Sequence, residues 1–260
     1  MDRSFLCKGC WSQMRVPIAL RGPLAVPFRV AGIRSSHMNP NVCTICERHF
    51  SRVKKSKQIP IDATVLFADI RGYTGLSQAL DSGSVMQILG AFYERCAQVV
   101  WEADGIINKL IGDAVLAVYN FPIAQPDHAA RAVRSAVELQ RHCADLCGSL
   151  VLPDGDGDEI GVGVGIHTGH VSIGEIGEVC RDFTAIGPAV NLAARLQTAA
   201  AAGEVLLSED AYRCVSDTLP GIVAEDLTLE GIDEAVTAYR IAPDAPSDDA
   251  TRGTDGACSA

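Results

Sequence analysis

The stretch that decides the fold is residues 61–70, which read IDATVLFADI. Its run of apolar and β-branched residues predicts a buried strand. Two further short strands are expected at residues 106–111 and 114–119. Only Gly112 and Asp113 separate them, so the connection must be a tight hairpin turn. The other predicted elements extend outward from these three strands.

Helices are predicted before and after the two short strands. Residues 75–103 predict about 30 helical residues, because apolar side chains recur there at helical spacing. A second helix is expected over residues 127–147, followed by strands at 160–167 and 171–176. The resulting β-α-β-β-α-β order predicts an α+β, ferredoxin-like core with an antiparallel sheet.

Composition divides the chain into three parts. We expect a small Cys-rich, basic N-terminal module at residues 1–58, an α+β domain at residues 59–242 and a disordered tail at residues 243–260. Beyond its core, the domain is expected to continue with four elements: a helix from Pro188 to a stop at Gly203, a strand at 204–208, a short helix at 209–215 and a terminal hairpin at 227–241.

Charge is distributed unevenly along the 260 residues, whose net charge is −10. Residues 1–60 hold 11 of the 22 Lys and Arg but only 2 of the 32 Asp and Glu, which leaves +9 there and −19 in the remainder. A basic segment can bind nucleic acid or an anionic membrane, but a solvated segment is the commoner case, so nucleic-acid binding is not expected. No apolar run reaches the roughly 18 residues of a spanning helix and no signal peptide is visible, so we expect a cytoplasmic protein without a membrane span.

Two carboxylates are expected to meet at one edge of the sheet. Asp69 lies near the end of its strand, and Asp113 starts the strand that runs antiparallel beside it in the ferredoxin-like topology. The two therefore lie one strand apart, about 4.8 Å in backbone spacing. Such a pair can bridge two divalent ions about 3.5–4 Å apart and so serve phosphoryl transfer. By topology alone, two solvated acidic side chains are the commoner outcome.

Four motifs follow one another along the chain: FADIRGYT at 67–74, KLIGD at 109–113, GIHTG at 165–169 and FTAIGPAVNLAAR at 183–195. Together they resemble the signature segments of class III adenylyl and guanylyl cyclase catalytic domains. The resemblance covers residues 60–241, approximately the whole α+β domain. It implies the class III nucleotide cyclase fold and the conversion of a nucleoside triphosphate into a cyclic nucleotide.

The resemblance implies a metal-binding group and a catalytic group. Asp69, Asp113 and the backbone carbonyl of Ile70 would hold two Mg²⁺ or Mn²⁺ ions. Asn191 would orient the ribose, and Arg195 would stabilise charge on the transition-state phosphate. Asn191 and Arg195 are four residues apart, which places them on one face of a helix, and a guanidinium group is well matched to phosphate.

The resemblance also implies which residues read the base. Lys109 would donate to the N1 acceptor of adenine, whereas guanine carries a donor there. Thr184 stands where many members have Asp and matches a Thr-containing subgroup of adenylyl cyclases, in which the hydroxyl meets the adenine amino group. Phe67 is a further residue expected to contact the substrate. These features favour an adenylate cyclase that forms 3',5'-cyclic AMP and pyrophosphate from ATP.

The resemblance implies that the site is shared between two subunits of a homodimer. One subunit would supply both metal-binding carboxylates. Its partner would supply the base-reading and catalytic side chains. A homodimer would then hold two composite sites, and a monomer is expected to be inactive.

Two departures from the family pattern concern the triphosphate. Glu230 stands where the family usually has a phosphate-binding Lys, and Gly163 stands where several members have a phosphate-contacting Arg. Arg71 or Arg181 could supply the missing positive charge. The alternative function is therefore a catalytically weak or inactive cyclase-like domain that binds a nucleotide or a partner.

The N-terminal segment carries two CxxC pairs, Cys7 with Cys10 and Cys43 with Cys46. Four thiolates suit one tetrahedral zinc ion, although the gap between the pairs is longer than in the usual zinc ribbon. A redox-active CxxC and unrelated free thiols are the other two interpretations. If the basic segment dominates the function, the protein is instead mainly a zinc- and nucleic-acid-binding regulator.

Overall fold

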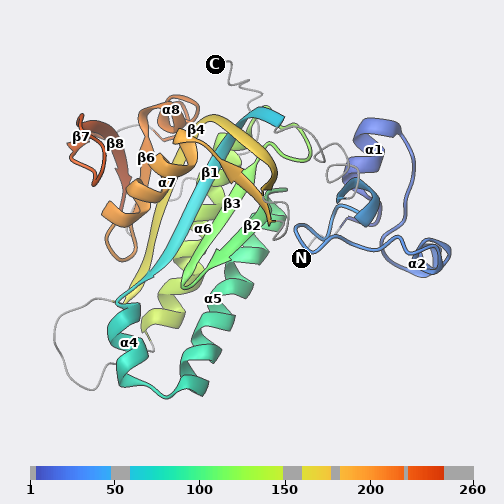
Figure 1. The fold of residues 1–260 in the computed structure, drawn as a ribbon, viewed down its shortest axis with the longest axis horizontal. Coiled ribbons are helices and arrows are strands. Elements are labelled where there is room, and N and C mark those ends of the chain that lie inside the picture. The colour runs from blue at the N-terminus through green and yellow to red at the C-terminus, as the bar shows by residue number, and fades with distance from the viewer. Residues whose placement is uncertain (1–3, 48–58, 149–159, 177–181, 220–221, 243–260) are drawn as a thin grey trace.

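A computed structural model describes residues 4–47, 59–148, 160–176, 182–219 and 222–242. Within these ranges the strands form one sheet in the order β2-β3-β1-β4-β6-β8-β7, and β5 pairs with β4 (Figure 1). The strands are β1 (Ile59–Arg71), β2 (Ile106–Ile111), β3 (Ala114–Tyr119), β4 (Gly161–Ile176), β5 (Asp182–Ile186), β6 (Val205–Ser208), β7 (Ala224–Leu227) and β8 (Val236–Ile241). The tail expected to be disordered lies outside the described residues.

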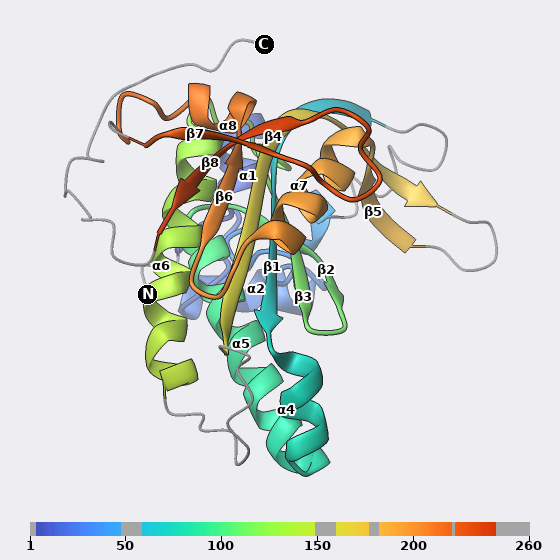
Figure 2. The same ribbon diagram turned by 90° about the vertical axis from the view of Figure 1, so that its left-hand side faces the viewer.

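Helices cover both faces of the sheet (Figure 2). The helices of the domain are α4 (Tyr73–Ala79), α5 (Ser82–Glu102), α6 (His128–Gly148), α7 (Pro188–Ala199) and α8 (Glu209–Arg213). α5 and α6 pack on one face, and α7 packs on the opposite face. The observed order and pairing confirm the predicted α+β core, because β3 lies antiparallel between β1 and β2.

β1 explains why a continuous apolar run appears in the sequence. Leu66 and Ala68 are buried in the cluster that includes α5 and α6. The alternate residues Val65 and Phe67 are buried in the cluster that includes α7. Successive side chains of a strand point to opposite faces, so a strand covered on both faces needs apolar residues at every position. Asp69 interrupts this run only at the end of the sheet.

The predicted helix over residues 75–103 is two helices in the structure. α4 ends at Ala79, and α5 begins at Ser82. Asp81 caps α5, since its carboxylate accepts hydrogen bonds from the backbone N–H groups of Gly83 and Ser84. Asp is a strong helix N-cap, so this break had a local signal that the apolar periodicity concealed.

The two strands expected at residues 160–167 and 171–176 are one strand, β4. β4 pairs with β1 along the whole length of β1, from Ile59 opposite Ile173 to Arg71 opposite Gly161. Its second half bends over the end of the sheet and carries β5, which had not been predicted as a strand (Figure 1). This bend brings β5 into contact with β2, although the two lie far apart in the strand order.

The N-terminal module packs against one end of the domain, beside β2 and β3 (Figure 1). It contains α1 (Lys8–Met14), a short 3₁₀ helix η1 (Pro23–Ala25) and α2 (Val26–Val30). Its Met38 carbonyl accepts hydrogen bonds from the indole N–H of Trp101 at 2.7 Å and from the backbone N–H of Ile107 at 3.2 Å. Lys8 also forms an ion pair of 2.5 Å with Asp104. The module therefore contacts both the end of α5 and the start of β2.

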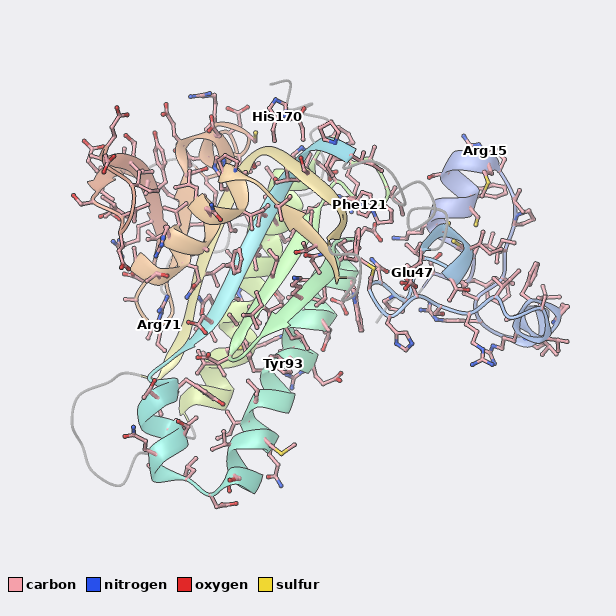
Figure 3. All side chains as sticks on the ribbon, in the orientation of Figure 1. Arg15, Glu47, Arg71, Tyr93, Phe121 and His170 are labelled. Carbon is pink, nitrogen blue, oxygen red and sulfur yellow. The ribbon has the colours of Figure 1, made fainter. Side chains whose placement is uncertain are left out.

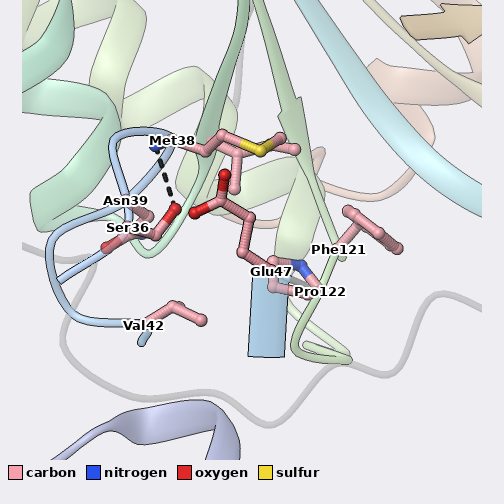
Figure 4. Close-up of a pocket in the computed structure, with 8 residues that line it drawn as sticks. Ser36, Met38, Asn39, Val42, Glu47, Phe121 and Pro122 are labelled. Carbon is pink, nitrogen blue, oxygen red and sulfur yellow. Dashed lines mark hydrogen bonds between the residues drawn. The ribbon is translucent and has the colours of Figure 1, made fainter. Parts of the chain in front are cut away.

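A small pocket lies at this junction between the module and the domain (Figure 4). Ser36, Met38 and Val42 line it from the module, and Phe121 and Pro122 line it from the segment after β3. Across the described residues, no helix is both long enough and apolar enough to span a bilayer.

Candidate active site

The structure brings Asp69 and Asp113 together at the edge of the sheet. Asp69 lies opposite Ala114 in the β1–β3 register, so Asp113 in the turn is its diagonal neighbour. Burial, followed by the charge of Asp113, raises the pKa of Asp69 to about 6. The Oδ1 atom of Asp69 is buried and has no hydrogen-bond partner among the described residues. Two crowded carboxylates with an unused oxygen fit a divalent cation, which would offset their repulsion.

A side chain of α5 holds the hairpin turn that carries Asp113. Gly112 adopts a positive φ of 60°, which favours glycine, and its carbonyl accepts a hydrogen bond from the hydroxyl of Tyr93 on α5 (Figure 3). Tyr93 was not singled out by the sequence, because a helical tyrosine carries no signal of the turn it will contact.

Asp69 is held from the other side by α7. Its Oδ2 atom accepts a hydrogen bond of 3.1 Å from the side-chain amide of Gln197. This contact depends on Gly165 of β4, since a Cβ atom there would lie 2.2 Å from the backbone nitrogen of Gln197. Gly165 belongs to the GIHTG motif, so the structure explains that glycine as a close approach of helix and strand. Gln197 was missed because its relation to Asp69 arises only from this packing.

Arg71 occupies the space above Gly163. A Cβ atom at position 163 would lie 2.4 Å from the Nε atom of Arg71, so a larger residue would displace the guanidinium group. Arg71 donates to the backbone carbonyl of Gln197 and lies 3.9 Å from the carboxylate of Asp69. Figure 3 places Arg71 at the end of β1 that leads into α4. Arg71 therefore brings a positive charge to the space beside Gly163, which has no side chain of its own. Arg181, the other residue that could supply this charge, lies outside the described residues.

Two other predicted site residues lie along β1. Ile70 directly follows Asp69 in the strand, and its side chain is buried beneath the sheet with α5 and α6. Its backbone therefore lies at the same edge as the carboxylate pair. Phe67 is 8% exposed and packs on the α7 face, two residues before Asp69.

The predicted base-reading residues lie on two strands that the bend of β4 brings together. Lys109 is on β2, and Thr184 is on β5. Asn108, immediately before Lys109, bridges the two strands: its Oδ1 atom accepts from the Ala185 backbone N–H at 3.2 Å and from the Thr184 hydroxyl at 3.4 Å. The structure thus joins the Lys109 strand to Thr184 within one chain.

Asn191 and Arg195 lie on α7, four residues apart as predicted. Arg195 donates from Nη1 to the Oε2 atom of Glu230, at 3.4 Å. Gln197, two residues further along, contacts Asp69 instead. Residues two apart on a helix differ by about 200° in direction, so Arg195 points away from the Asp69 edge of its own chain. Within the described chain, α7 therefore directs Gln197 toward Asp69 and Arg195 toward Glu230.

The four predicted zinc ligands converge in the N-terminal module. The Sγ atoms of Cys7, Cys10, Cys43 and Cys46 all lie within 4.8 Å of one another, and all four residues are buried. Four of the Sγ–Sγ distances are 3.7, 3.4, 3.3 and 3.8 Å. A tetrahedral ion with Zn–S bonds of about 2.3 Å requires sulfur separations of about 3.8 Å.

The surroundings of these sulfurs also fit a metal. The Sγ atom of Cys7 accepts hydrogen bonds from the backbone N–H groups of Cys10 and Cys43, at 3.4 and 3.2 Å. Such bonds stabilise thiolates. Burial raises the pKa of Cys10 to about 12, so its ionised form needs a cation beside it.

This fold and this arrangement of side chains define a nucleotide cyclase domain. Residues 56–241 match the family described as the adenylate and guanylate cyclase catalytic domain, and the chain belongs to that family. It is 32% identical over 188 residues to an adenylate cyclase of Anabaena cylindrica, a match that covers 68% of this chain and 36% of that protein. The chain thus spans about a third of the length of that relative.

Solved structures of the family resemble the chain closely in fold. The adenylyl cyclase CyaB from P. aeruginosa matches with a TM-score of 0.62 and 28% identity, over 71% of this chain and 95% of that chain. The guanylyl cyclase Cya2 matches with a TM-score of 0.63 and 26% identity, over 70% of this chain and 92% of that chain. Both base specificities therefore occur among the relatives.

Proposed function

We propose that the protein is an adenylate cyclase that converts ATP into 3',5'-cyclic AMP and pyrophosphate for signalling. The observation that carries the proposal is the pair of Asp69 and Asp113 at one sheet edge, with the unused Oδ1 atom of Asp69. Lys109 and Thr184, joined through Asn108, supply the preference for adenine.

In this proposal each side chain has one task. Asp69, Asp113 and the Ile70 carbonyl would hold two Mg²⁺ or Mn²⁺ ions, which when bound would lower the pKa of the ribose 3'-hydroxyl and offset the triphosphate charge. Asn191 orients the ribose. Arg195 donates to the α-phosphate as its charge grows, while the 3'-hydroxyl releases its proton to water, the 3'-oxygen bonds to the α-phosphorus and the bond to pyrophosphate breaks.

We also propose that the working enzyme is a homodimer with composite sites. The direction of α7 supports this arrangement, because Gln197 faces Asp69 of its own chain whereas Arg195 faces away. A second chain is then needed to bring an Arg195 to each carboxylate pair. In this proposal Phe67, which lies on the α7 face two residues before Asp69, contacts the bound substrate.

The ion pair between Arg195 and Glu230 favours a second candidate function, a cyclase-like domain with weak or no turnover. Glu230 brings a negative charge to the guanidinium group that should meet the phosphate. Its carboxylate is 85% exposed, so the pair is a weak one that a triphosphate can displace. We therefore rank the active enzyme first.

For the N-terminal module we propose a structural zinc site formed by the four cysteines. The short sulfur separations and the hydrogen bonds to Cys7 support a closed tetrahedral site over a redox pair. Zinc analysis of the purified protein tests this directly, and about one zinc per chain is the expected result.

The cyclase proposal is tested with the full chain, ATP and Mg²⁺ or Mn²⁺. Cyclic AMP should form, and Asp69→Ala, Asp113→Ala and Arg195→Ala should each nearly abolish it. A mixture of Asp69→Ala with Arg195→Ala should regain activity, because each heterodimer contains one site without either substitution. ATP binding without cyclic AMP would favour the weak cyclase-like domain, and a mixture without recovery would contradict the composite site.

A further inference from the structure

Asn108 occupies a β-bulge in β2. Ile107 lies opposite Ala117 of β3 and Lys109 lies opposite Leu116, so Asn108 is the extra residue between them. A bulge breaks the regular alternation of a strand and redirects a side chain. Here it releases Asn108 from pairing with β3 and lets its amide reach β5.

Only one orientation of the Asn108 side-chain amide provides an acceptor for the backbone N–H that β5 directs toward it. The backbone N–H of Ala185 donates to Oδ1 at 3.2 Å. Rotating the amide by 180° would place its NH₂ group against that N–H, donor against donor. Oδ1 therefore stays on the β5 side, where it is also 3.4 Å from the hydroxyl of Thr184.

The hydroxyl of Thr184 therefore has its hydrogen-bond acceptors inside the protein. Its two described acceptors are Oδ1 of Asn108, at 3.4 Å, and the backbone carbonyl of Ala185, at 3.3 Å. Asn108 supports both of these acceptors. Its Oδ1 atom accepts from the Thr184 hydroxyl, and it also accepts from the backbone N–H of Ala185, which fixes the position of the Ala185 carbonyl. With its hydrogen committed, the hydroxyl offers a base only lone pairs.

Lone pairs distinguish the two purines. The exocyclic 6-amino group of adenine is a donor, whereas O6 of guanine is an acceptor. A hydroxyl locked as an acceptor toward the base binds the first and repels the second. We propose that Asn108 is a specificity-determining, positioning residue that selects adenine by fixing the hydrogen-bond direction of Thr184. This inference rests on the proposed cyclase function and adds the residue that sets its base preference.

The test compares kcat/KM for ATP and GTP in the full-length protein. Asn108→Leu keeps the approximate side-chain size but removes the acceptor, so the ATP-to-GTP ratio should fall about 5- to 10-fold, the worth of one hydrogen bond. Asn108→Asp keeps an acceptor oxygen and should retain most of the ratio. Thr184→Val removes the hydroxyl and should lower the ratio by a similar factor.

The double variant Asn108→Leu/Thr184→Val gives the decisive comparison. If Asn108 acts through the hydroxyl, its substitution adds no further change to the ratio once Thr184 is Val. Independent, multiplying effects would overturn the proposal, as would an unchanged ratio in Asn108→Leu. Thermal melting of each variant identifies a folding defect, which lowers both rates without changing their ratio.

Failure of the cyclase function itself is distinguished by equilibrium binding. Should the unsubstituted protein form no cyclic nucleotide, the same ratio is measured by calorimetric titration with ATP and with GTP. An ATP preference that falls in Asn108→Leu then supports the inference without turnover. Equal affinities of the unsubstituted protein for ATP and GTP would overturn it.

Discussion

The guanidinium group of Arg195 lies 3.4 Å from the carboxylate of Glu230. Arg195 is the residue proposed to stabilise the transition state, and Glu230 is the most serious departure from the family pattern. In the sequence, Glu230 stands where the family usually has a phosphate-binding Lys, and its carboxylate would repel the triphosphate if it pointed into the site. In the structure it also pairs with the guanidinium group that is proposed to meet the phosphate. Both effects act against catalysis, and both are limited because the pair is exposed to solvent.

Glu230→Gln should therefore raise kcat/KM for ATP. An exposed ion pair contributes about 0.2–1 kcal/mol, so the expected increase is up to about fivefold. Steady-state cyclase assays at low ionic strength measure it. Glu138→Gln is the matched control, since Glu138 forms an exposed pair with Arg141 on α6 and should leave the rate unchanged. A slower Glu230→Gln enzyme would show that the carboxylate assists the reaction.

Asp69→Asn should stabilise the metal-free protein while removing activity. The folded-state pKa of Asp69 is raised from 3.8 to about 6, so folding costs free energy once this carboxylate ionises. That cost is fully present once the pH is above the folded-state pKa, on the order of 3 kcal/mol, and disappears below the unfolded value. Thermal melts with a chelator should show a higher Tm for the variant at pH 8, and a smaller difference as the pH is lowered through 6. A lower Tm for the variant at pH 8 would contradict the strained carboxylate pair.

Gly163→Ala should disturb Arg71, because the new Cβ atom would lie 2.4 Å from its Nε. Overpacking of this kind costs about 1–3 kcal/mol. Denaturant unfolding measures the loss. The same substitution in an Arg71→Ala background should cost much less, since the clashing group is gone. Equal costs in both backgrounds would show that Arg71 does not occupy this space.

Removal of zinc should weaken the catalytic domain as well as the module. Met38 of the module binds Trp101 and Ile107, at the end of α5 and the start of the strand that carries Lys109. Cys43→Ser should abolish zinc binding, lower the Tm and reduce cyclase activity several-fold. His37→Ala, an exposed residue outside the cysteine cluster, is the control and should keep its zinc. Full activity in zinc-free Cys43→Ser would show that the module does not support the site.

Much of the fold and part of the site follow from local sequence. The buried strand β1 and the hairpin of β2 and β3 are visible as apolar runs around a two-residue turn, and they place Asp69 beside Asp113. Spacing on one helix likewise sets Asn191 and Arg195 on one face. These relations need only the geometry of a strand, a turn or a helix, which short stretches of sequence determine.

Other relations exist only because distant segments meet. The bend of β4 brings Thr184 to Asn108, the glycine at 165 lets Gln197 reach Asp69, and the packing of the N-terminal module gathers two CxxC pairs into one cluster. The sequence by itself determined which chemical groups this protein carries and which neighbours along the chain share a face. The tertiary structure alone decided which carboxylate neutralises Arg195 and which amide orients Thr184, because contacts between residues far apart in sequence depend on how whole strands and helices pack.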